Sequence, residues 1–462
     1  MKVNIVGSGI GGSGIGALLA NVGFDVELFE KNSLPGGRFC TYEREGFHID
    51  VGCHIIANCE NGTCGEILNQ IGMPIQWTYV RNPRPVFHFM GKFINFPKDI
   101  PKLNLPNKDV SGLLKMLATI NQLKESEIEK YDDMDVRSFI SEYTTDPRVR
   151  SLFGFIIGLY FVAPDFQTSV GEWIYCQKEI QRFKSSGLPI GGTISIPKTY
   201  CKCIEKNGGK IHLNTPVKKI VVEDNKATGI ELHDGTFIPS DIVISNAGIK
   251  ATVNQLVGRK YFPSDYVKLV DSYQYSLATI MVKVALKRKI TNEKFIMYVA
   301  SENLEEFADI MYKKEIPEKH VMVMIPIISN LDPTAAPEGK QLLIAGAGAP
   351  ANPEQGNCNY KKWEEAILNS LRDIFPDIDD AILWIDTTTP MDIKKFAGEE
   401  GVVIGISQIV GQVGKNRPKQ ELPIENLYCC CADTGSRHIG GELAAESALR
   451  LFSKLKNKTI GS

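Results

Sequence analysis

Val3-Asn4-Ile5-Val6-Gly7-Ser8-Gly9-Ile10-Gly11-Gly12 opens the chain, and this stretch decides the fold. A short apolar run leads into a glycine-rich turn, and Gly16 follows one helical turn after Gly12. The run Val26-Glu27-Leu28-Phe29-Glu30 then comes at the distance where a second strand ends in an acidic residue. This pattern is a dinucleotide-binding fingerprint: a strand, a glycine-rich turn, a helix of small residues and a second strand that ends in a carboxylate. The sequence therefore predicts a nucleotide-binding βαβ unit in these residues.

The residues of this unit have separate expected roles. Gly7 suits a turn with positive φ, and Gly9 lets the backbone approach a pyrophosphate. Gly12 and Gly16 allow the helix to lie close to the sheet, while the helix dipole favours the phosphate charge. Glu30 can accept hydrogen bonds from a ribose diol and would repel a 2′-phosphate. The dinucleotide contacts expected here are Gly7, Ser8, Gly9, Ile10, Gly11, Gly12, Gly16, Glu30 and Lys31.

Charge balance and cysteine spacing exclude several classes of protein. Lysine plus arginine number 52 against 54 acidic residues in a chain of 462, so we expect no nucleic-acid partner. Val3 to Phe24 carries no charge, but its many glycines would make a poor signal peptide or membrane anchor. The apolar run Leu152 to Ala163 is too short to span a membrane and predicts a buried helix, while peripheral membrane contact stays open. Eleven cysteines without CxxC spacing predict reduced thiols, a cytoplasmic location and no metal site.

Two further segments favour a flavin over a nicotinamide. Gly36-Gly37-Arg38 follows the ribose acid and offers close backbone approach together with a cation. Asn426 to Asp433 is expected to form a strand ending in a carboxylate that can bind ribityl hydroxyls. The helix that starts at Ile439-Gly440-Gly441 can place its N-terminus against the flavin and stabilise negative charge on the reduced ring. Together these segments predict FAD as the dinucleotide.

With these motifs the chain resembles the flavin-containing amine oxidase and phytoene desaturase superfamily. The resemblance also rests on the middle segment from Gly191 to Ala247. It implies that Val217 lies beside the adenine and that Asn246 ends a strand near the cofactor. It implies non-covalent FAD as well, because the Ser-Gly-Gly-Cys-Tyr run that carries a covalent cysteine in some amine oxidases is missing. The further cofactor contacts expected are Gly36, Gly37, Arg38, Val217, Asn246, Asp433, Ile439 and Gly440.

The predicted fold class is α/β, with a Rossmann-type FAD-binding domain (glutathione reductase-like) interleaved with a sheet-plus-helical-cap substrate domain. Residues 211–245 have the pattern of a strand meander, 108–145 carry helical periodicity, and 361–374 predict a helix. The resemblance implies a discontinuous FAD-binding domain of residues 1–75, 190–270 and 395–462, and a substrate domain of residues 76–189 and 271–394.

In this superfamily a hydride passes between a substrate C–H bond and flavin N5. The features of amine oxidases, a covalent cysteine run or an aromatic pair at the flavin, are missing here, where Thr434 to His438 stand instead. We therefore expect desaturation, saturation or isomerisation of a C–C bond in a hydrophobic unsaturated substrate. Oxidation of an amine is the alternative, and a remote one is non-enzymatic prenyl-lipid binding, as in the similar Rab GDP-dissociation inhibitors. The electron donor or acceptor stays unknown.

Three ionisable side chains are candidates for acid–base catalysis. His54 follows the turn Asp50-Val51-Gly52 and is expected near the flavin, with a structural hydrogen bond as the alternative. His438 precedes the flavin-facing helix. Glu442 lies in the first turn of that helix, where the dipole alone would favour a carboxylate. Hydride transfer at an activated carbon can proceed without a strong base, so a structural role stays open for all three.

Overall fold

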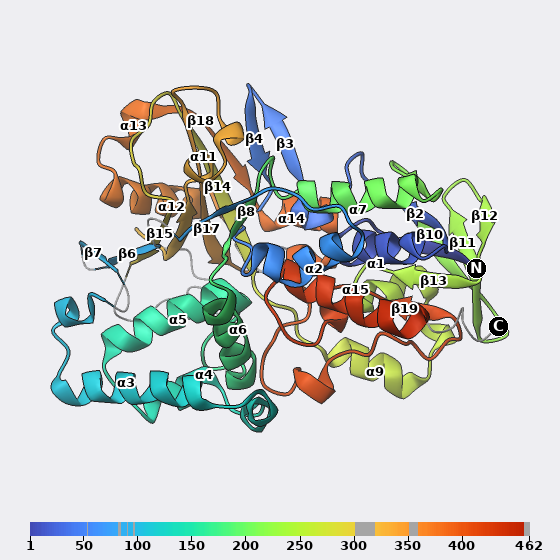
Figure 1. The fold of residues 1–462 in the computed structure, drawn as a ribbon, viewed down its shortest axis with the longest axis horizontal. Helices are drawn as coiled ribbons and strands as arrows, with labels where there is room; N and C mark the ends of the chain where they lie inside the picture. Colours follow the sequence, from blue (N-terminus) through green and yellow to red (C-terminus); the bar gives the residue numbers. More distant parts are fainter. Residues whose placement is uncertain are drawn as a thin grey trace.

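Five parallel strands from three distant parts of the chain form the first sheet (Figure 1). In this computed structural model, which describes residues 1–52, 54–81, 85–89, 91–95, 98–300, 319–350 and 359–456, the strand order is β19-β13-β1-β2-β9. Every neighbouring pair is parallel, as in a Rossmann-type sheet. The strands are β1 (Lys2–Val6), β2 (Asp25–Phe29), β9 (Lys210–His212), β13 (Ile242–Ser245) and β19 (Leu427–Cys429).

Side chains of this sheet alternate between two apolar layers. Val3, Ile5 and Leu28 pack against helices on one face, whereas Val6 and Phe29 face an antiparallel meander on the other. Because both faces are covered, a ligand can approach only at the ends of the strands. The helices are α1 (Ile10–Asn21), α2 (Thr63–Gln70), α7 (Ser195–Lys206) and α15 (Gly441–Leu455). On the meander side lie β10 (Val217–Glu223), β11 (Lys226–Leu232), β12 (Phe237–Pro239), α8 (Ile249–Ala251) and α9 (Ser264–Ser272).

A second sheet has seven strands in the order β18-β14-β17-β16-β15-β6-β7. On β14, Ile280 and Val282 pack with the helix α12, while Met281 and Ala285 face the opposite side, as the two-residue period of a strand requires. The strands are β6 (Val86–Phe89), β7 (Lys92–Ile94), β14 (Ala278–Leu286), β15 (Phe295–Val299), β16 (Val323–Pro326), β17 (Gln341–Ala349) and β18 (Ile382–Thr388). The helices on the α12 side are α12 (Tyr360–Ile374) and α13 (Ile378–Ala381).

Four helices lie on the other side of the second sheet and form the lower left of Figure 1. They are α3 (Asn107–Gln122), α4 (Val136–Ser141), α5 (Pro147–Phe161) and α6 (Val170–Phe183). Asp146 caps α5 by accepting a hydrogen bond from the backbone N–H of Arg148, and Val162 ends the helix with a left-handed φ of 46°. The remaining elements are the pairs β3 (Thr41–Arg44) with β4 (Phe47–Asp50) and β5 (Trp77–Tyr79) with β8 (Gly187–Pro189), and the short helices α11 (Ile328–Leu331) and α14 (Pro390–Ala397).

The predicted fold class is confirmed, and so are the meander and the helix at 361–374. The run Leu152 to Ala163 falls largely in α5, whose apolar side chains are mostly buried. The helical periodicity over 108–145 is interrupted, because Leu123 is extended and residues 125–131 form tighter turns before α4. Parts of the predicted domain ranges, among them 301–318, 351–358 and 457–462, lie outside the described residues. Within the described chain, every helix is too short or too polar to cross a membrane.

Candidate functional site

A cavity of about 1590 Å³ extends from the ends of the parallel strands to the face of the second sheet that carries Met281. One end is lined by the glycine-rich loop and the other by aromatic and methionine side chains. A single drug-sized ligand occupies a pocket of about 300–1,000 Å³. The cavity therefore has room for a dinucleotide and a second molecule.

Asn246, just after β13, lies directly behind the glycine-rich loop. Its Nδ2 donates to the carbonyl of Cys430 at 2.6 Å, which fixes the side chain. A Cβ on Gly9 would lie 2.5 Å from Asn246 Oδ1, and one on Gly11 would lie 2.8 Å from Nδ2. Gly7 has a φ of 95°, as the predicted turn requires. The loop is thus held closely from behind, and its free side lines the cavity.

Two helices begin at this cavity. The N-cap of α1 is Gly9 and that of α15 is Gly440, and neither N-terminus has a side-chain cap. Residues of both first turns, including Gly11 and Gly441, line the cavity. Unpaired backbone N–H groups and the positive end of the helix dipole favour anionic or electron-rich groups at both places. This arrangement fits a pyrophosphate at α1 and a flavin carbonyl at α15.

Glu30 is buried after the end of β2, and both of its carboxylate oxygens have protein donors. Ser8 donates to Oε2 from its hydroxyl (2.6 Å) and its backbone N–H (3.0 Å). Asn32 donates to Oε1 from its backbone N–H (2.9 Å) and its side-chain amide (2.8 Å). A ribose hydroxyl would therefore replace one of these donors. Asn32 was not predicted, although it follows the acid by two residues and lines the same cavity.

The Gly36–Arg38 turn lies across from the glycine-rich loop. A Cβ built on Gly37 would meet only the Cα of Gly9, at 4.0 Å, so the two backbones border a narrow space. Arg38 lines the cavity and donates from Nε to the carbonyl of Val402 at 3.1 Å. Its side chain therefore borders the cavity and is partly held by the protein.

His54 lines the cavity, as predicted, and its Nε2 lies 2.9 Å from the carbonyl of Arg38. Its ring packs on Phe39 with the ring centroids 4.6 Å apart. Burial lowers the pKa of His54, although the charge of Asp50 acts in the opposite direction. A neutral ring that donates to Arg38 matches the structural alternative and fixes the Arg38 backbone.

Glu442 also lines the cavity, but its carboxylate is held by the N-terminus of α2. Its Oε2 accepts from the hydroxyl of Thr63 (2.6 Å) and from the backbone N–H of Cys64 (3.2 Å). Burial raises the pKa of Glu442, and these hydrogen bonds act against the rise. The side chain thus joins the starts of α2 and α15.

His438 is not among the described residues that line the large cavity. Its ring stacks on Tyr175 at 5.2 Å, and burial lowers its pKa to about 4. Its carbonyl accepts from Gln408 Nε2 (2.9 Å), which also donates to the buried Glu172 (2.6 Å). Arg437 donates to the other oxygen of Glu172 at 3.0 Å. Sequence reasoning missed this network, because Glu172 and Gln408 come from segments without a recognisable motif.

Asp433, predicted to bind ribityl hydroxyls, is turned toward the protein. Its two oxygens accept from the backbone N–H groups of Ile406 (2.7 Å) and Ile249 (2.8 Å). Its neighbours Cys431 and Ala432 line the cavity, but among the described lining residues Asp433 does not appear. The carboxylate thus ties three segments of the chain together beside the site.

The structure brings most of the predicted cofactor residues to one cavity. Gly12 and Gly16 face the protein instead, where a Cβ would lie 2.1 Å from Gly7 O and 2.8 Å from Ile204 Cδ1, respectively. The predicted residues that line the cavity are Gly7, Ser8, Gly9, Ile10, Gly11, Glu30, Lys31, Gly36, Gly37, Arg38, His54, Val217, Asn246, Ile439, Gly440 and Glu442.

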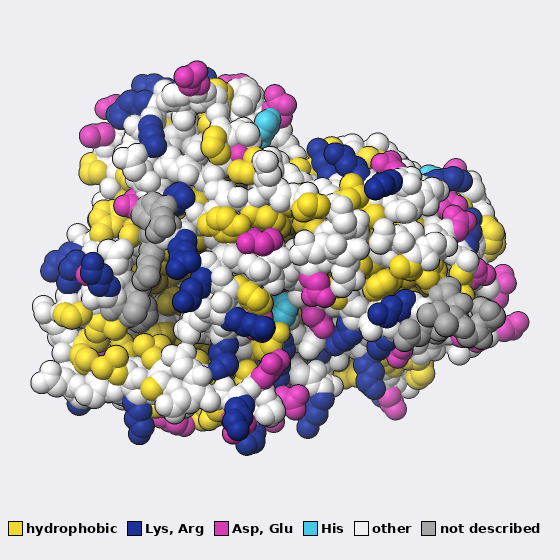
Figure 2. Space-filling model, viewed as in Figure 1, with side chains coloured by type: hydrophobic (Ala, Val, Ile, Leu, Met, Phe, Trp, Pro, Cys, Tyr) yellow, Lys and Arg dark blue, Asp and Glu magenta, His cyan; other side chains and the backbone are white. Residues whose placement is uncertain are grey.

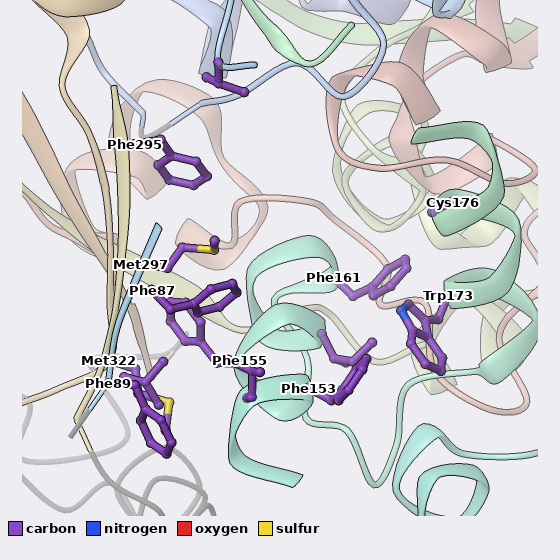
Figure 3. Close-up of a cluster of buried hydrophobic side chains, with 14 of the residues drawn as sticks. Phe87, Phe89, Phe153, Phe155, Phe161, Trp173, Cys176, Phe295, Met297 and Met322 are labelled. Carbon is purple, nitrogen blue, oxygen red and sulfur yellow. The ribbon is translucent and has the colours of Figure 1, made fainter. Parts of the chain in front are cut away.

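The other half of the cavity is apolar (Figure 3). Phe87, Phe295 and Met297 project from the second sheet toward α5, which presents Phe155, and Trp173 of α6 borders the same space. Methionine and aromatic side chains make adaptable contacts with flat or unsaturated groups. This half can enclose a large apolar molecule.

The structure combines a glycine-rich loop at the end of a parallel sheet with an adjoining apolar space. A family model described as flavin containing amine oxidoreductase matches residues 16–441. The chain belongs to this family and is a flavin-dependent oxidoreductase, which confirms the resemblance inferred from the motifs.

Similar proteins span nearly the whole chain. A 4,4′-diaponeurosporene oxygenase of Staphylococcus haemolyticus is 22% identical (92% of this chain, 91% of that protein), and a zeta-carotene-forming phytoene desaturase of Myxococcus xanthus is 23% identical (94% and 90%). An oxidoreductase of Methanosarcina mazei has a similar structure, with a TM-score of 0.77 and 22% identity over 98% of this chain and 100% of that one. Putrescine oxidase bound to putrescine has a TM-score of 0.74 and 13% identity over 100% of both chains. At 22% and 13% sequence identity, the structural similarity shows that the fold is shared and nothing further.

Proposed function

We propose that this protein binds FAD non-covalently and oxidises, reduces or isomerises a C–C bond of a hydrophobic unsaturated substrate. The observation that carries the proposal is one continuous cavity with a glycine-rich cradle at one end and an aromatic, methionine-rich lining at the other. Relatives named as phytoene desaturase and diaponeurosporene oxygenase support the same substrate class.

The residues at the polar end have distinct parts in holding the cofactor. The first turn of α1 would bind the pyrophosphate and Glu30 the ribose, while Val217 would border the adenine. The first turn of α15, with Ile439 and Gly440, would face the flavin ring. Bound FAD supplies an atom, N5, that accepts or gives a hydride. His54 and Glu442 hold the backbone around the ring and are proposed to move no proton.

The apolar end would orient the substrate and exclude water. Among the described residues, four acidic side chains line the cavity, and each one already has a protein donor: Glu30, Asp165, Glu400 and Glu442. Asp165, for example, accepts from Arg137 at 2.9 and 3.0 Å. A substrate ammonium would compete with these donors, so the amine alternative is disfavoured. Purified enzyme supplied with putrescine or cyclohexylamine should form no hydrogen peroxide; steady peroxide formation with imine product would establish the alternative.

The cofactor part is tested by acid precipitation of the yellow holoprotein. We expect all flavin in the supernatant and its identification as FAD by chromatography. Colour that stays in the pellet would show a covalent link, and NAD in the supernatant would refute the cofactor assignment.

We also propose the domain division and the cytoplasmic location expected above. The described cysteines are all free thiols, including Cys429 and Cys431, whose sulfurs lie 3.6 Å apart without a bond. Unbonded thiols at that distance suit a reducing compartment.

A further inference from the structure

Two cationic side chains in the cavity lining have no partner among the described residues. Six lysine and arginine side chains line the cavity, and four of them have hydrogen bonds or ion pairs with the protein: Lys31, Arg38, Lys250 and Lys394. Arg81 and Lys184 are the other two, and both are exposed to solvent. They therefore stand at the edge of the cavity, with their charges available to a ligand.

Backbone pairing brings these two cations together. β5 and β8 are antiparallel, and the backbone N–H of Val80 donates to the carbonyl of Ser186 at 3.0 Å, so Arg81 comes beside residues 184–186. Lys294 adds a third cation, because its Nζ donates to the carbonyl of Tyr79 at 3.0 Å. Figure 2 shows Lys and Arg side chains on both sides of a hollow between the second sheet and the helices below it.

One face of α6 leads from the apolar interior to this cationic edge. Trp173, Gln177, Ile180 and Gln181 line the cavity with the spacing of a single helix face. Lys184, the C-cap residue of α6, lines it just beyond them. The face is apolar at Trp173, carries amides in the middle and leads to the ammonium of Lys184, over about 16 Å. A molecule that followed it would need an apolar body and a polar or anionic end.

We propose that the substrate is an amphipathic anion, an unsaturated apolar chain whose carboxylate or phosphate head is bound by Arg81 and Lys184. The inference rests on the proposed function and adds a charged head group to the apolar substrate. Asp165, the acid that lines the apolar part, is paired with Arg137, so it leaves these cations unmatched. Two cations that remain exposed beside an apolar space attract anions at low ionic strength and release them as salt is added.

Binding of matched probes to the FAD-loaded enzyme tests the proposal. The pairs are retinoic acid against retinol and geranylgeranyl phosphate against geranylgeraniol, each measured by calorimetry at low and high salt. We expect at least one anion to bind about tenfold or more tightly than its alcohol, equal to about 1.4 kcal/mol, and this preference should fall with salt. The first pair reports on a carboxylate head and the second on a phosphate head.

Substitutions test whether the preference for the anion depends on Arg81 and Lys184 or on the overall charge of the protein. The double variant R81Q/K184Q should lose the preference for the anion and bind the alcohols as before. Arg182→Gln is the matched control, because Arg182 is exposed on the same helix, pairs with Glu179 and is not a cavity-lining residue. Equal binding of acid and alcohol by the native enzyme would overturn the proposal, and so would an anion preference that persists in the double variant.

Turnover distinguishes this inference from the proposed function. If alkenes react with the enzyme but acid and alcohol are used equally, the inference fails and the proposed function stands. If the anion preference depends on Arg81 and Lys184 but no C–C bond is changed, the inference stands and the proposed function fails.

Discussion

The side-chain oxygen of Asn246 occupies the space that any side chain at Gly9 would need, 2.5 Å from the position of its Cβ. Asn246 cannot swing away freely, because its amide donates to the carbonyl of Cys430. The contact joins the loop after β1 to the residues that follow β13 and β19. The protein itself therefore requires glycine at position 9, whatever contact a bound cofactor makes on the cavity side.

We predict that Gly9→Ala weakens FAD binding by about 1–3 kcal/mol, the usual cost of overpacking. Removing the obstructing oxygen in the double variant G9A/N246A should recover part of the loss, and the double-mutant cycle measures the coupling. Gly158→Ala is the control for FAD binding, since Gly158 lies on α5 at the apolar half of the cavity and a Cβ there meets no atom within 4 Å. Equal flavin content in Gly9→Ala and native protein would show that the contact relaxes without effect.

Glu30→Ala should weaken FAD binding by about 1–3 kcal/mol, the scale for losing a charged hydrogen-bond partner. The loss also leaves the donors of Ser8 and Asn32 unpaired. Titration of apoprotein with FAD, followed by flavin fluorescence, gives the dissociation constant. Glu66→Ala, an exposed acid on α2, should bind FAD normally. An unchanged constant for Glu30→Ala would exclude the ribose contact.

Glu172 should make stability depend on pH. Burial raises its pKa from 4.5 to about 7, while Arg437 and Arg417 lower it and Asp132 raises it. Between these values the folded state binds more protons than the unfolded state, so the stability that Glu172 contributes falls as pH rises from about 4.5 to 7 and is then constant.

Glu172→Gln cannot lose that proton. The free energy of unfolding of native protein minus that of Glu172→Gln should therefore decrease between about pH 5 and 7, by at most about 1.4 kcal/mol per pH unit. Urea unfolding at several pH values measures it, and Glu142→Gln, an exposed acid after α4, should show no such trend. A difference that stays flat or increases with pH would mean that Glu172 is ionised throughout.

Truncation before Asn426 should yield flavin-free, poorly folded protein, because it removes β19, Asp433 and α15. A chain that ends at Lys456 is the control and should keep its FAD. Flavin content and circular dichroism report the outcome. Full-affinity FAD binding by residues 1–200 alone would refute the discontinuous domain.

The glycine-rich loop was predictable because its determinants are local in sequence. Gly7, Gly9 and Glu30 lie within one βαβ unit, and the structure brings them to one cavity. The apolar half was not predictable residue by residue, since it depends on strand register: Phe87 on β6 pairs with Met297 on β15. No local pattern reports that pairing across some two hundred residues of chain.

The orientation of buried polar side chains could not be predicted from the sequence either. The strand expected over Asn426 to Asp433 ends at Cys429, and Asp433 lies in the single 3-10 turn that follows. Its carboxylate accepts from the backbone N–H groups of Ile249 and Ile406, which come from two other segments. His438 precedes α15 as expected, yet a φ of 137° and the stack on Tyr175 direct its ring away from the large cavity. These side-chain orientations depend on contacts with segments that are distant in the sequence.

Anaerobic reaction of the photoreduced holoenzyme with a panel of polyenes, enones, quinones and amines tests the central claim most directly. We predict re-oxidation by an activated alkene, with one equivalent of saturated product recovered, and no bleaching of the oxidised enzyme by simple amines. Rapid bleaching by an amine with imine product, and no reaction with any alkene, would contradict the account.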